Sequence, residues 1–368
     1  MKIKTITCHD VYNYGAALQA YALQTYLQSL GHDVEIIDYK PDYMRVHYKF
    51  WRVPEQSRYY ERAMKSWLFH FMLCCYFIPR RYATIGRKFN FDAFVKQHLK
   101  LTRRYNSYQE LVDCPPKADI YVAGSDQIWN SELPNGKDPG YFLQFGSKEV
   151  KRIAYAASFA ISNIADKYKE LNKLWLNKFN AISVRERTGV SIVNSLGLEC
   201  EEVVDPVFLL NKWQWDNFSG QDRIIKEKYI LVYDLYVDDS RLSERSKLLA
   251  STYNLKIVSV DGSLKCPYAQ KNISNAGPIE FVNLIKNAEY IITNSFHATA
   301  FSVIFNKRFN VFYKLKNISR LTDFLHNVQL EFCLNPEKVS QNYNWDVVNQ
   351  SLINMCNSSI RYLSSNVK

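Results

Sequence analysis

The sequence predicts an α/β protein built from two domains, and three observations lead to this prediction. The chain has 368 residues, which is long for a single hydrophobic core. Strand and helix patterns alternate over residues 2–38, and a second series of them begins at Tyr229. Apolar residues make up 47% of the chain and charged residues 23%, a composition typical of folded rather than disordered proteins.

The chain begins with a predicted β-α-β unit. We expect a strand at residues 2–8, a helix at 15–30 that ends at Gly31, and a strand at 34–38. The turn at 9–15 (H-D-V-Y-N-Y-G) lacks the G-x-G-x-x-G pattern, so the sequence does not indicate a dinucleotide site. A small anion or a sugar could bind at this strand-to-helix turn.

Most of the positive charge lies between residues 40 and 110. Fifteen Lys or Arg and five Asp or Glu there give a net charge of +10, against +11 for the whole chain. Such a basic region suits nucleic acid, an anionic membrane surface or a phosphorylated substrate. Because no nucleic-acid-binding motif accompanies it, we expect no nucleic-acid partner.

Within this region, residues 67–78 form a short apolar and aromatic run (W-L-F-H-F-M-L-C-C-Y-F-I) bounded by Lys65, Arg80 and Arg81. The run is too short to cross a bilayer. It suits a helix or hairpin in the interface of an anionic leaflet, which would be contacted through residues 65–81. The alternative is a buried helix under a charged rim.

The loop at residues 124–130 carries groups that could bind a sugar. It follows an expected helix at 89–98 and an expected strand at 118–123, and it reads G-S-D-Q-I-W-N. Ser125, Asp126 and Gln127 could form hydrogen bonds with sugar hydroxyls, and Trp129 could stack on a sugar ring. A simple turn with a packed Trp129 is the alternative.

Arg185 is a candidate anion ligand in the rest of the first half. Here we expect a strand at 152–159, a helix at 166–180 and a strand at 181–184 that leads into Arg185. A guanidinium donates in pairs to carboxylate or phosphate, although an Arg at a strand end is often only solvated. Residues 203–206 end this half, and we expect residues 211–228 to be a linker.

Ser295 and His297 stand at a predicted strand-to-helix turn in the second half. Ser295 would cap the helix and put His297 in the first turn, beside unpaired N–H groups that can hold an anion. A capped or solvated histidine is the alternative. The pair Asp238 and Asp239 could suggest a metal site, but Asp239 or Ser240 is better explained as an N-cap. We expect strands at 229–235, 255–260, 290–293 and 309–313, and helices at about 240–250, 279–286 and 297–305, from 321 and from 344.

The eight cysteines show no C-x-x-C pair and no histidine spacing typical of zinc sites. The N-terminus resembles a strand rather than a signal peptide. We therefore expect a cytoplasmic protein with reduced thiols and no bound metal.

Seven motifs follow one another along the chain: N-Y-G-A-A-L-Q-A-Y-A-L, G-S-D-Q-I-W-N, Y-A-A-S-F, S-V-R-E-R-T-G, V-D-P-V-F-L-L, T-N-S-F-H-A-T-A-F-S-V and N-I-S-R-L. Together they resemble the polysaccharide pyruvyl transferase family, in the same order, over residues 3–330. The resemblance implies two Rossmann-like domains that face each other across a cleft, as in GT-B glycosyltransferases. Residues 1–210 would form the acceptor domain, with the basic insert at about 40–110. Residues 211–345 would form the donor domain, and residues 346–368 a helix that crosses back.

The resemblance also implies an enzyme that moves the enolpyruvyl group of phosphoenolpyruvate onto two hydroxyls of a sugar, without a cofactor or a metal. His297 falls on the family's functional histidine, Arg185 on an arginine of its anion site, and Arg320 on a further motif position. Ser295 stands where many members of the family have Arg. We therefore expect Arg185, Arg320 or Lys314 to hold the donor, together with Ser295 at the helix end.

Ketal formation needs a proton donor and a base, and we expect His297 as the general acid and Asp126 as the base or hydrogen-bond acceptor for a sugar hydroxyl. The acceptor would be an undecaprenyl-diphosphate-linked oligosaccharide at the inner face of the cytoplasmic membrane. A GT-B glycosyltransferase that uses a nucleotide sugar and a non-catalytic sugar-binding protein are the rival functions. The expected acceptor-binding residues are Asn13, Tyr14, Gly15, Ser125, Gln127 and Trp129.

Overall fold

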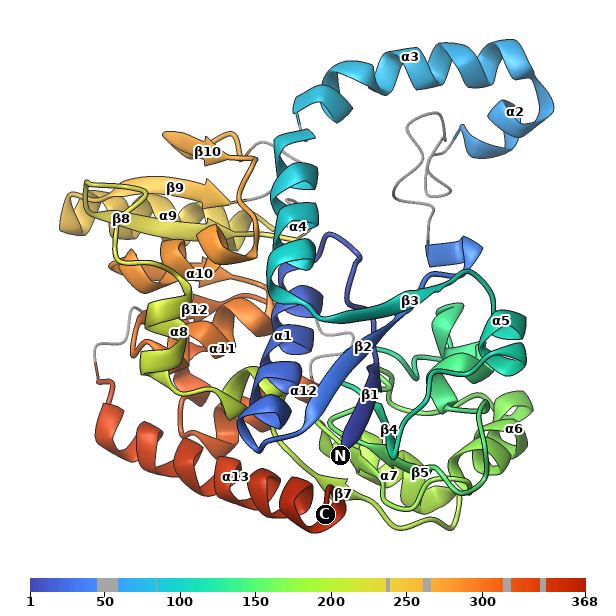
Figure 1. Cartoon of the computed structure of the whole chain (residues 1–368). Coiled ribbons are helices and arrows are strands. Elements are labelled where there is room, and N and C mark those ends of the chain that lie inside the picture. Colours follow the sequence, from blue (N-terminus) through green and yellow to red (C-terminus); the bar gives the residue numbers. More distant parts are fainter. Residues whose placement is uncertain (45–58, 84, 236–238, 261–265, 314–318, 338–341) are drawn as a thin grey trace.

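Two parallel five-stranded sheets form the frame of the molecule (Figure 1). The computed structural model describes residues 1–44, 59–83, 85–235, 239–260, 266–313, 319–337 and 342–368. Helices pack around both sheets, and α1 and α4 stand between them. The predicted α/β class with two Rossmann-like sheets is confirmed.

The first sheet has the strand order β3-β2-β1-β4-β5. Because this order reverses between β1 and β4, the loops that follow these two strands flank the point where open α/β sheets bind ligands. The strands are β1 (Lys2–Ile6), β2 (Asp33–Tyr39), β3 (Leu101–Tyr105), β4 (Ile120–Ala123) and β5 (Lys151–Ala154). Its helices are α1 (Tyr14–Ser29), α4 (Ile85–His98), α5 (Tyr108–Asp113), α6 (Asp166–Leu176) and α7 (Arg187–Ser195).

The second sheet repeats this arrangement in the order β10-β9-β8-β11-β12. Its reversal lies between β8 and β11, so the loop that follows β11 also ends at a ligand-binding edge. The strands are β8 (Tyr229–Tyr233), β9 (Lys256–Val260), β10 (Lys271–Ile273), β11 (Tyr290–Thr293) and β12 (Arg308–Val311). The helices are α9 (Ser240–Tyr253), α10 (Pro278–Asn287), α11 (Phe296–Ile304) and α12 (Ser319–Asn327).

Two short strands and several short 3-10 helices complete the connections among the described residues. The strands, β6 (Ser183–Val184) and β7 (Glu201–Glu202), pair in parallel. The 3-10 helices are Asn135–Lys137, Pro139–Phe142, Pro206–Leu209 and Glu331–Cys333.

One hydrophobic core joins the two sheets. The ring of Tyr14 on α1 stacks on Phe281 of α10, with the ring centroids 4.2 Å apart and the planes 6° from parallel. The Tyr14 hydroxyl also donates to the carbonyl of Ala276 over 3.0 Å. Phe91 and Phe94 of α4 are buried in the same cluster as Phe281. The two sheets are therefore packed against each other and not merely connected by the chain.

The predicted linker at 211–228 is wrong in part, because it contains α8 (Lys212–Phe218). Asn211 caps this helix in a reciprocal capping box with Gln214. Trp215 is fully buried, and its indole N–H donates to the carbonyl of Val207 over 2.9 Å. A short helix held by one buried tryptophan has too few apolar positions to show a helical period in the sequence.

The predicted strand at 152–159 is shorter than expected, since β5 ends at Ala154. Ala156 and Ala160 have φ values of 54° and 52°, in the left-handed region. A residue in this region cannot continue a strand, so the chain turns away from the sheet here.

The last helix, α13 (Trp345–Asn366), returns from the second sheet to the first. The Tyr362 hydroxyl donates to the carbonyl of Ala154, at the end of β5, over 2.8 Å. The Ser359 hydroxyl accepts from the backbone N–H of Val204 over 2.9 Å. These contacts tie the end of the chain to the first sheet, while the domain boundaries at residues 210 and 345 stay a prediction.

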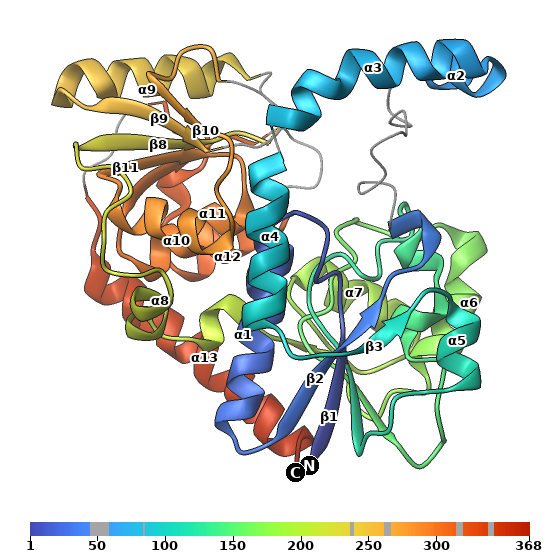
Figure 2. The same cartoon turned by 45° about the horizontal axis from the view of Figure 1, so that its top comes forward.

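The apolar run at 67–78 lies in α3 (Trp67–Ala83), which projects from the body together with α2 (Tyr60–Lys65) (Figure 2). The alternative of a buried helix is wrong, because the Trp67 side chain is 81% exposed. No helix among the described residues has the length and hydropathy that a membrane crossing requires.

Candidate active site

A cavity of about 110 Å³ lies between the carboxyl ends of the two sheets, and we call it the cleft cavity. The loops that follow β1 and β4 line it from the first sheet, and the loops that follow β8, β11 and β12 line it from the second. Six residues that the sequence singled out meet here: Asn13, Asp126, Gln127, Ser295, His297 and Arg320.

His297 lies in the first turn of α11, as predicted. The hydroxyl of Ser295 caps this helix by accepting from the N–H of Ala298 over 3.4 Å. The imidazole rests on Gly15 in the first turn of α1, so closely that a Cβ atom at Gly15 would lie 2.0 Å from Nδ1. Only glycine allows this approach. Gly15 was predicted to contact the acceptor, but in the structure it packs against the His297 ring.

Asp205 is the closest carboxylate to His297 among the described ion pairs, with Oδ2 at 3.6 Å from Nε2. It is fully buried, and it accepts from Nη1 of Arg185 over 2.5 Å and from the N–H of Val207 over 3.1 Å. Burial alone would raise the pKa of the Asp205 carboxyl, but His297 and Arg185 lower this pKa well below its ordinary value. Asp205 is therefore an anion in the folded protein.

The two nitrogens of the His297 ring have different surroundings. Nε2 is buried and faces Asp205, whereas the ring lines the cleft cavity. Nδ1 lies over Gly15 instead. A carboxylate at one ring nitrogen holds the proton there and orients the ring, so that the other nitrogen can exchange a proton with a ligand.

Arg185 is held among carboxylates behind the cleft cavity. Its side chain is only 1% exposed and lies 3.7 Å from Asp126 and 3.8 Å from Glu186, in addition to its pair with Asp205. Burial lowers the pKa of the Arg185 guanidinium, but Asp205, Asp126 and Glu186 together raise it above the ordinary value. The charge of Arg185 thus stabilises the carboxylates of the site, and it does not line the cleft cavity.

Arg320 supplies the cation that does line it. Its guanidinium lies 5.9 Å from the ring centroid of Phe296, and that of Arg185 lies 5.5 Å from the same ring. Burial, and then the nearby charge of Arg185, lower the pKa of Arg320. Two crowded guanidinium groups repel each other, and an anionic ligand would relieve this repulsion. Lys314, the third predicted cation, lies outside the described residues.

Two helix N-termini point to the cleft cavity. The side chain of Asn13 caps α1 by accepting from the N–H of Ala16 over 3.3 Å, and Ser295 caps α11. Both capping residues line the cavity. The positive end of each helix favours a negative charge, so the two helices together suit a small ligand with two anionic groups.

Asp126 stands on the first-sheet side of the cleft cavity with a φ of 73°. This left-handed conformation is uncommon outside glycine, and such strain is typical of functional sites. The N–H of Ser158 donates to the Asp126 carbonyl over 3.0 Å and helps to hold the loop. The Asp126 side chain is 20% exposed and lines the cavity, where it can meet a hydroxyl group in addition to its ion pair with Arg185.

Three predicted acceptor-binding residues are buried, and these predictions are wrong for contact with a ligand. Trp129 has no exposed surface; its indole N–H donates to the carbonyl of Tyr141 over 3.2 Å, and its ring stacks on Phe142. Tyr14 belongs to the core between the sheets. Ser125 is buried, and its hydroxyl donates to Asp205 over 3.3 Å. These side chains hold the loops in place and leave no surface for a sugar.

Sequence reasoning did not identify Asp205 or Glu186. Oε1 of Glu186 accepts from the hydroxyl of Ser158 and from the N–H groups of Phe159 and Ala160, over 2.8 to 3.1 Å. Asp205 precedes a proline, and this pattern indicates a turn. It gives no sign that Asp205 also contacts His297. Asp205 could have been identified from its position just beyond the end of a strand, next to the motif that contains Arg185.

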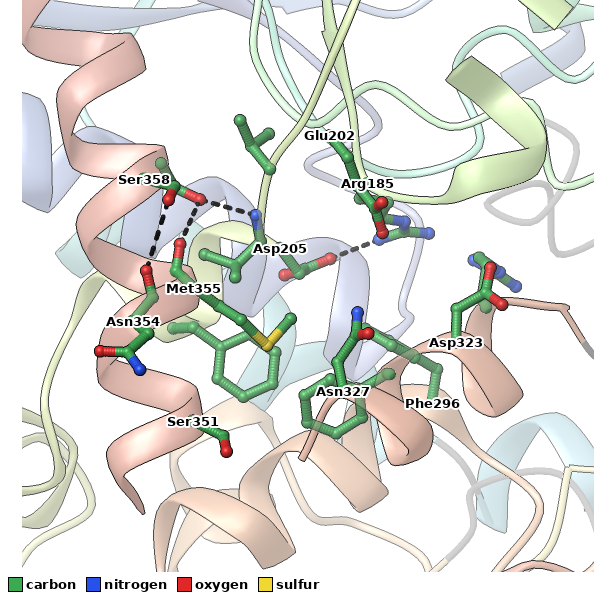
Figure 3. A pocket seen from close by; sticks show the side chains of 16 residues that line it. Arg185, Glu202, Asp205, Phe296, Asp323, Asn327, Ser351, Asn354, Met355 and Ser358 are labelled. Carbon is green, nitrogen blue, oxygen red and sulfur yellow. Dashed lines mark hydrogen bonds and ion pairs between the residues drawn. The ribbon is translucent and has the colours of Figure 1, made fainter. Parts of the chain in front are cut away.

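A second cavity of about 400 Å³ lies behind Phe296 and Arg320, which line both cavities (Figure 3). Side chains from α12, α13 and the stretch 202–208 surround it, and Arg185 and Asp205 lie at one end.

Among the residues that the structure describes, no three His, Cys, Asp or Glu side chains gather as a metal site would require.

These features define an α/β enzyme of two facing sheets with an anion-binding cavity and a histidine between them. Residues 13–313 match the model of the polysaccharide pyruvyl transferase family, and the chain belongs to this family. It is therefore a transferase that acts on a sugar or polysaccharide, which confirms the family resemblance seen in the motifs. No curated protein matches the sequence significantly.

Solved structures share the fold at low identity. S. aureus MnaA, solved with UDP, is 13% identical with a TM-score of 0.52, over 96% of this chain and 87% of that one. A Listeria monocytogenes protein assigned as a UDP-N-acetylglucosamine 2-epimerase is 8% identical with a TM-score of 0.51, over 98% of this chain and 89% of that one. At these identities the likeness shows the fold alone.

Proposed function

We propose that this transferase moves the enolpyruvyl group of phosphoenolpyruvate onto two hydroxyls of a sugar, giving a cyclic pyruvate ketal and phosphate. The observation that carries the proposal is the position of His297, which lies between Asp205 and a small cavity at two helix N-termini.

The donor suits the cleft cavity in size and charge. The cavity of about 110 Å³ is smaller than the ~300–1,000 Å³ of pockets that enclose drug-sized ligands. A three-carbon enol phosphate fits this size better than a nucleotide sugar does. Arg320 and the N-termini of α1 and α11 would hold its carboxylate and phosphate, with Arg320 replacing the cation that many family members carry at the position of Ser295.

The reaction needs protons to move at two places. His297 would deliver a proton from Nδ1 to the methylene carbon of the donor while the first sugar oxygen bonds to the central carbon. The phosphate then leaves with the electrons of its C–O bond, and the second sugar oxygen closes the ring. Of the two hydroxyl protons, one replaces that of His297 and the other leaves with phosphate. Asp126 would accept the second of these protons first and pass it to the departing phosphate, which restores the carboxylate.

We further propose that the acceptor is an oligosaccharide carried on undecaprenyl diphosphate, in capsular or exopolysaccharide synthesis. Asn13 and Gln127, which line the cleft cavity beside Asp126, would contact its hydroxyls. The enzyme would then work peripherally at the inner face of the cytoplasmic membrane. The net charge of +10 in residues 40–110 supports this, since it suits a diphosphate and an anionic leaflet.

Ligand-induced thermal stabilisation tests the donor. Millimolar phosphoenolpyruvate should raise the melting temperature of the wild-type protein, and the rise should shrink in Arg320→Ala. UDP- and ADP-sugars serve as the comparison in the same assay. Stabilisation by a nucleotide sugar alone would overturn the proposal and favour the glycosyltransferase.

A further inference from the structure

We propose that α2 and α3, which we call the arm, bind the surface of an anionic bilayer through the exposed face of α3. This inference deepens the proposed function by naming the surface at which the acceptor is met, and only that link rests on the proposed function. The shape, burial and charge of the arm carry the rest.

The exposed face of α3 is apolar along its length. Five large side chains on it are exposed, and Trp67 and Tyr76 reach 81% and 77%. Spacings of three and four residues link these side chains into one stripe that runs along and partly around the helix. A soluble monomer rarely leaves a continuous apolar face of this kind, and such a face usually marks an interaction site. The five residues are Trp67, Leu68, Phe71, Met72 and Tyr76.

The opposite face of α3 is already covered. Ala63 of α2 and Cys74 of α3 are buried in a small cluster of their own, against which Tyr60, Phe69 and Leu73 pack. This cluster is separate from the cores around the two sheets. The arm therefore has its own packed interior. Its exposed face does not belong to the hydrophobic core around the sheets.

Charge favours an anionic leaflet over a second copy of the chain. The sequence of α3 contains no Asp or Glu, and α2, next to its start, carries exposed Arg62 and Lys65 against one exposed carboxylate, Glu61. Two arms facing each other would bring these like charges together, whereas anionic lipid headgroups would neutralise them. Tryptophan and tyrosine beside cations are typical of helices that lie in the headgroup region.

The arm is held on the side of the molecule where the strands of the first sheet end, which is also the side of the cleft cavity. α4 carries it, and Phe91 and Phe94 fix α4 in the core between the sheets. A guanidinium N–H of Arg87 donates to the carbonyl of Tyr12 over 2.9 Å, one residue before Asn13 of the cleft cavity. Both views show α3 beyond the edge where the strands of the first sheet end (Figures 1 and 2). A membrane-bound arm would thus hold the cleft near the leaflet.

Vesicle sedimentation of the full-length protein tests the inference. We expect binding to vesicles of three parts phosphatidylcholine to one part phosphatidylglycerol, little binding to phosphatidylcholine alone, and weaker binding at high salt. The double substitution Trp67→Glu and Phe71→Glu should weaken binding at least tenfold. Trp213→Glu is the matched control, because Trp213 is 70% exposed on α8, away from the arm.

Three results would overturn the inference. The wild type could fail to bind anionic vesicles, the double variant could bind them as tightly as the wild type, or the wild type could prove to be a dimer while the double variant is a monomer. The last result would make the face an interface between copies. If the double variant does not fold, Met72→Glu with Tyr76→Glu replaces it. Stabilisation by phosphoenolpyruvate is measured on the same samples, so a failure of the proposed donor is seen separately.

Discussion

Nε2 of His297 lies 3.6 Å from Oδ2 of Asp205, although the two residues come from opposite halves of the chain. The histidine begins a helix of the second sheet, and the aspartate stands where the chain leaves the first. Ser125 and Arg185 of the first half hold the aspartate in turn. The pair exists only when the two sheets are packed together, so the chemistry of the site depends on the core between them.

Substitution of Asp205 tests its effect on His297. Asp205→Asn keeps the shape but removes the charge that orients the imidazole, so kcat should fall by about 100-fold, within the range for a positioned proton transfer. The KM for the donor should change less than kcat, because Asp205 orients the histidine and does not line the cleft cavity. Asp216→Asn, in a surface ion pair with Lys286, is the control. An unchanged kcat would contradict the role of Asp205.

Asp205 should also make stability depend on pH. Its pKa is lowered in the folded protein, so the folded form binds fewer protons than the unfolded form below about pH 5. The stabilisation is present above the unfolded pKa of about 3.9 and is lost as the pH falls through the folded pKa. Denaturant titrations should therefore show that Asp205→Asn is less stable than wild type at pH 7, by about 1–3 kcal/mol. The difference should narrow toward pH 2; a constant difference would argue against a charged Asp205.

Gly15→Ala tests the close contact between Gly15 and the His297 ring. The added methyl group would lie 2.0 Å from Nδ1, so the ring must move and activity should fall nearly as far as in His297→Ala. A double-mutant cycle separates this effect from general damage. In the His297→Ala background, Gly15→Ala should cause no further loss of activity. A loss of equal size in both backgrounds would show that Gly15 acts elsewhere.

Arg320→Ala should weaken binding of phosphoenolpyruvate by about 10- to 100-fold, as expected for the loss of one or more charge-assisted hydrogen bonds. Calorimetric titration measures this directly, and Arg320→Lys should recover part of the affinity. Arg187→Ala is a suitable control, because Arg187 is an exposed arginine that contacts Asn327 and Glu202. Equal affinity in Arg320→Ala and Arg187→Ala would exclude Arg320 as a donor ligand.

Trp129 should affect stability and not substrate affinity. Trp129→Ala removes a fully buried indole and should lower the free energy of unfolding by about 3–5 kcal/mol. Trp129→Phe fills more of the space and should keep the kinetic constants near those of wild type. Chemical denaturation and steady-state kinetics on the two variants distinguish the effects. A raised KM for the acceptor in Trp129→Phe would restore the stacking role.

Local patterns predicted what depends on neighbouring residues. The helix cap at Ser295, the first-turn position of His297 and the alternation of strands and helices follow from short-range periodicity and capping, and the structure has them. The family motifs added the facing of the two sheets. Prediction failed where long-range packing decides. Trp129 stands in a polar loop, yet the packing of Phe142 and Tyr141 buries it. Asp205 meets His297 only through the tertiary fold.

The stack of Tyr14 on Phe281 has a consequence for cooperativity. Neither half of the molecule can unfold alone without exposing aromatic surface that the other half now covers. The protein should therefore melt in a single calorimetric transition, with equal van't Hoff and calorimetric enthalpies. For the same reason we expect the two halves to stay in contact during turnover.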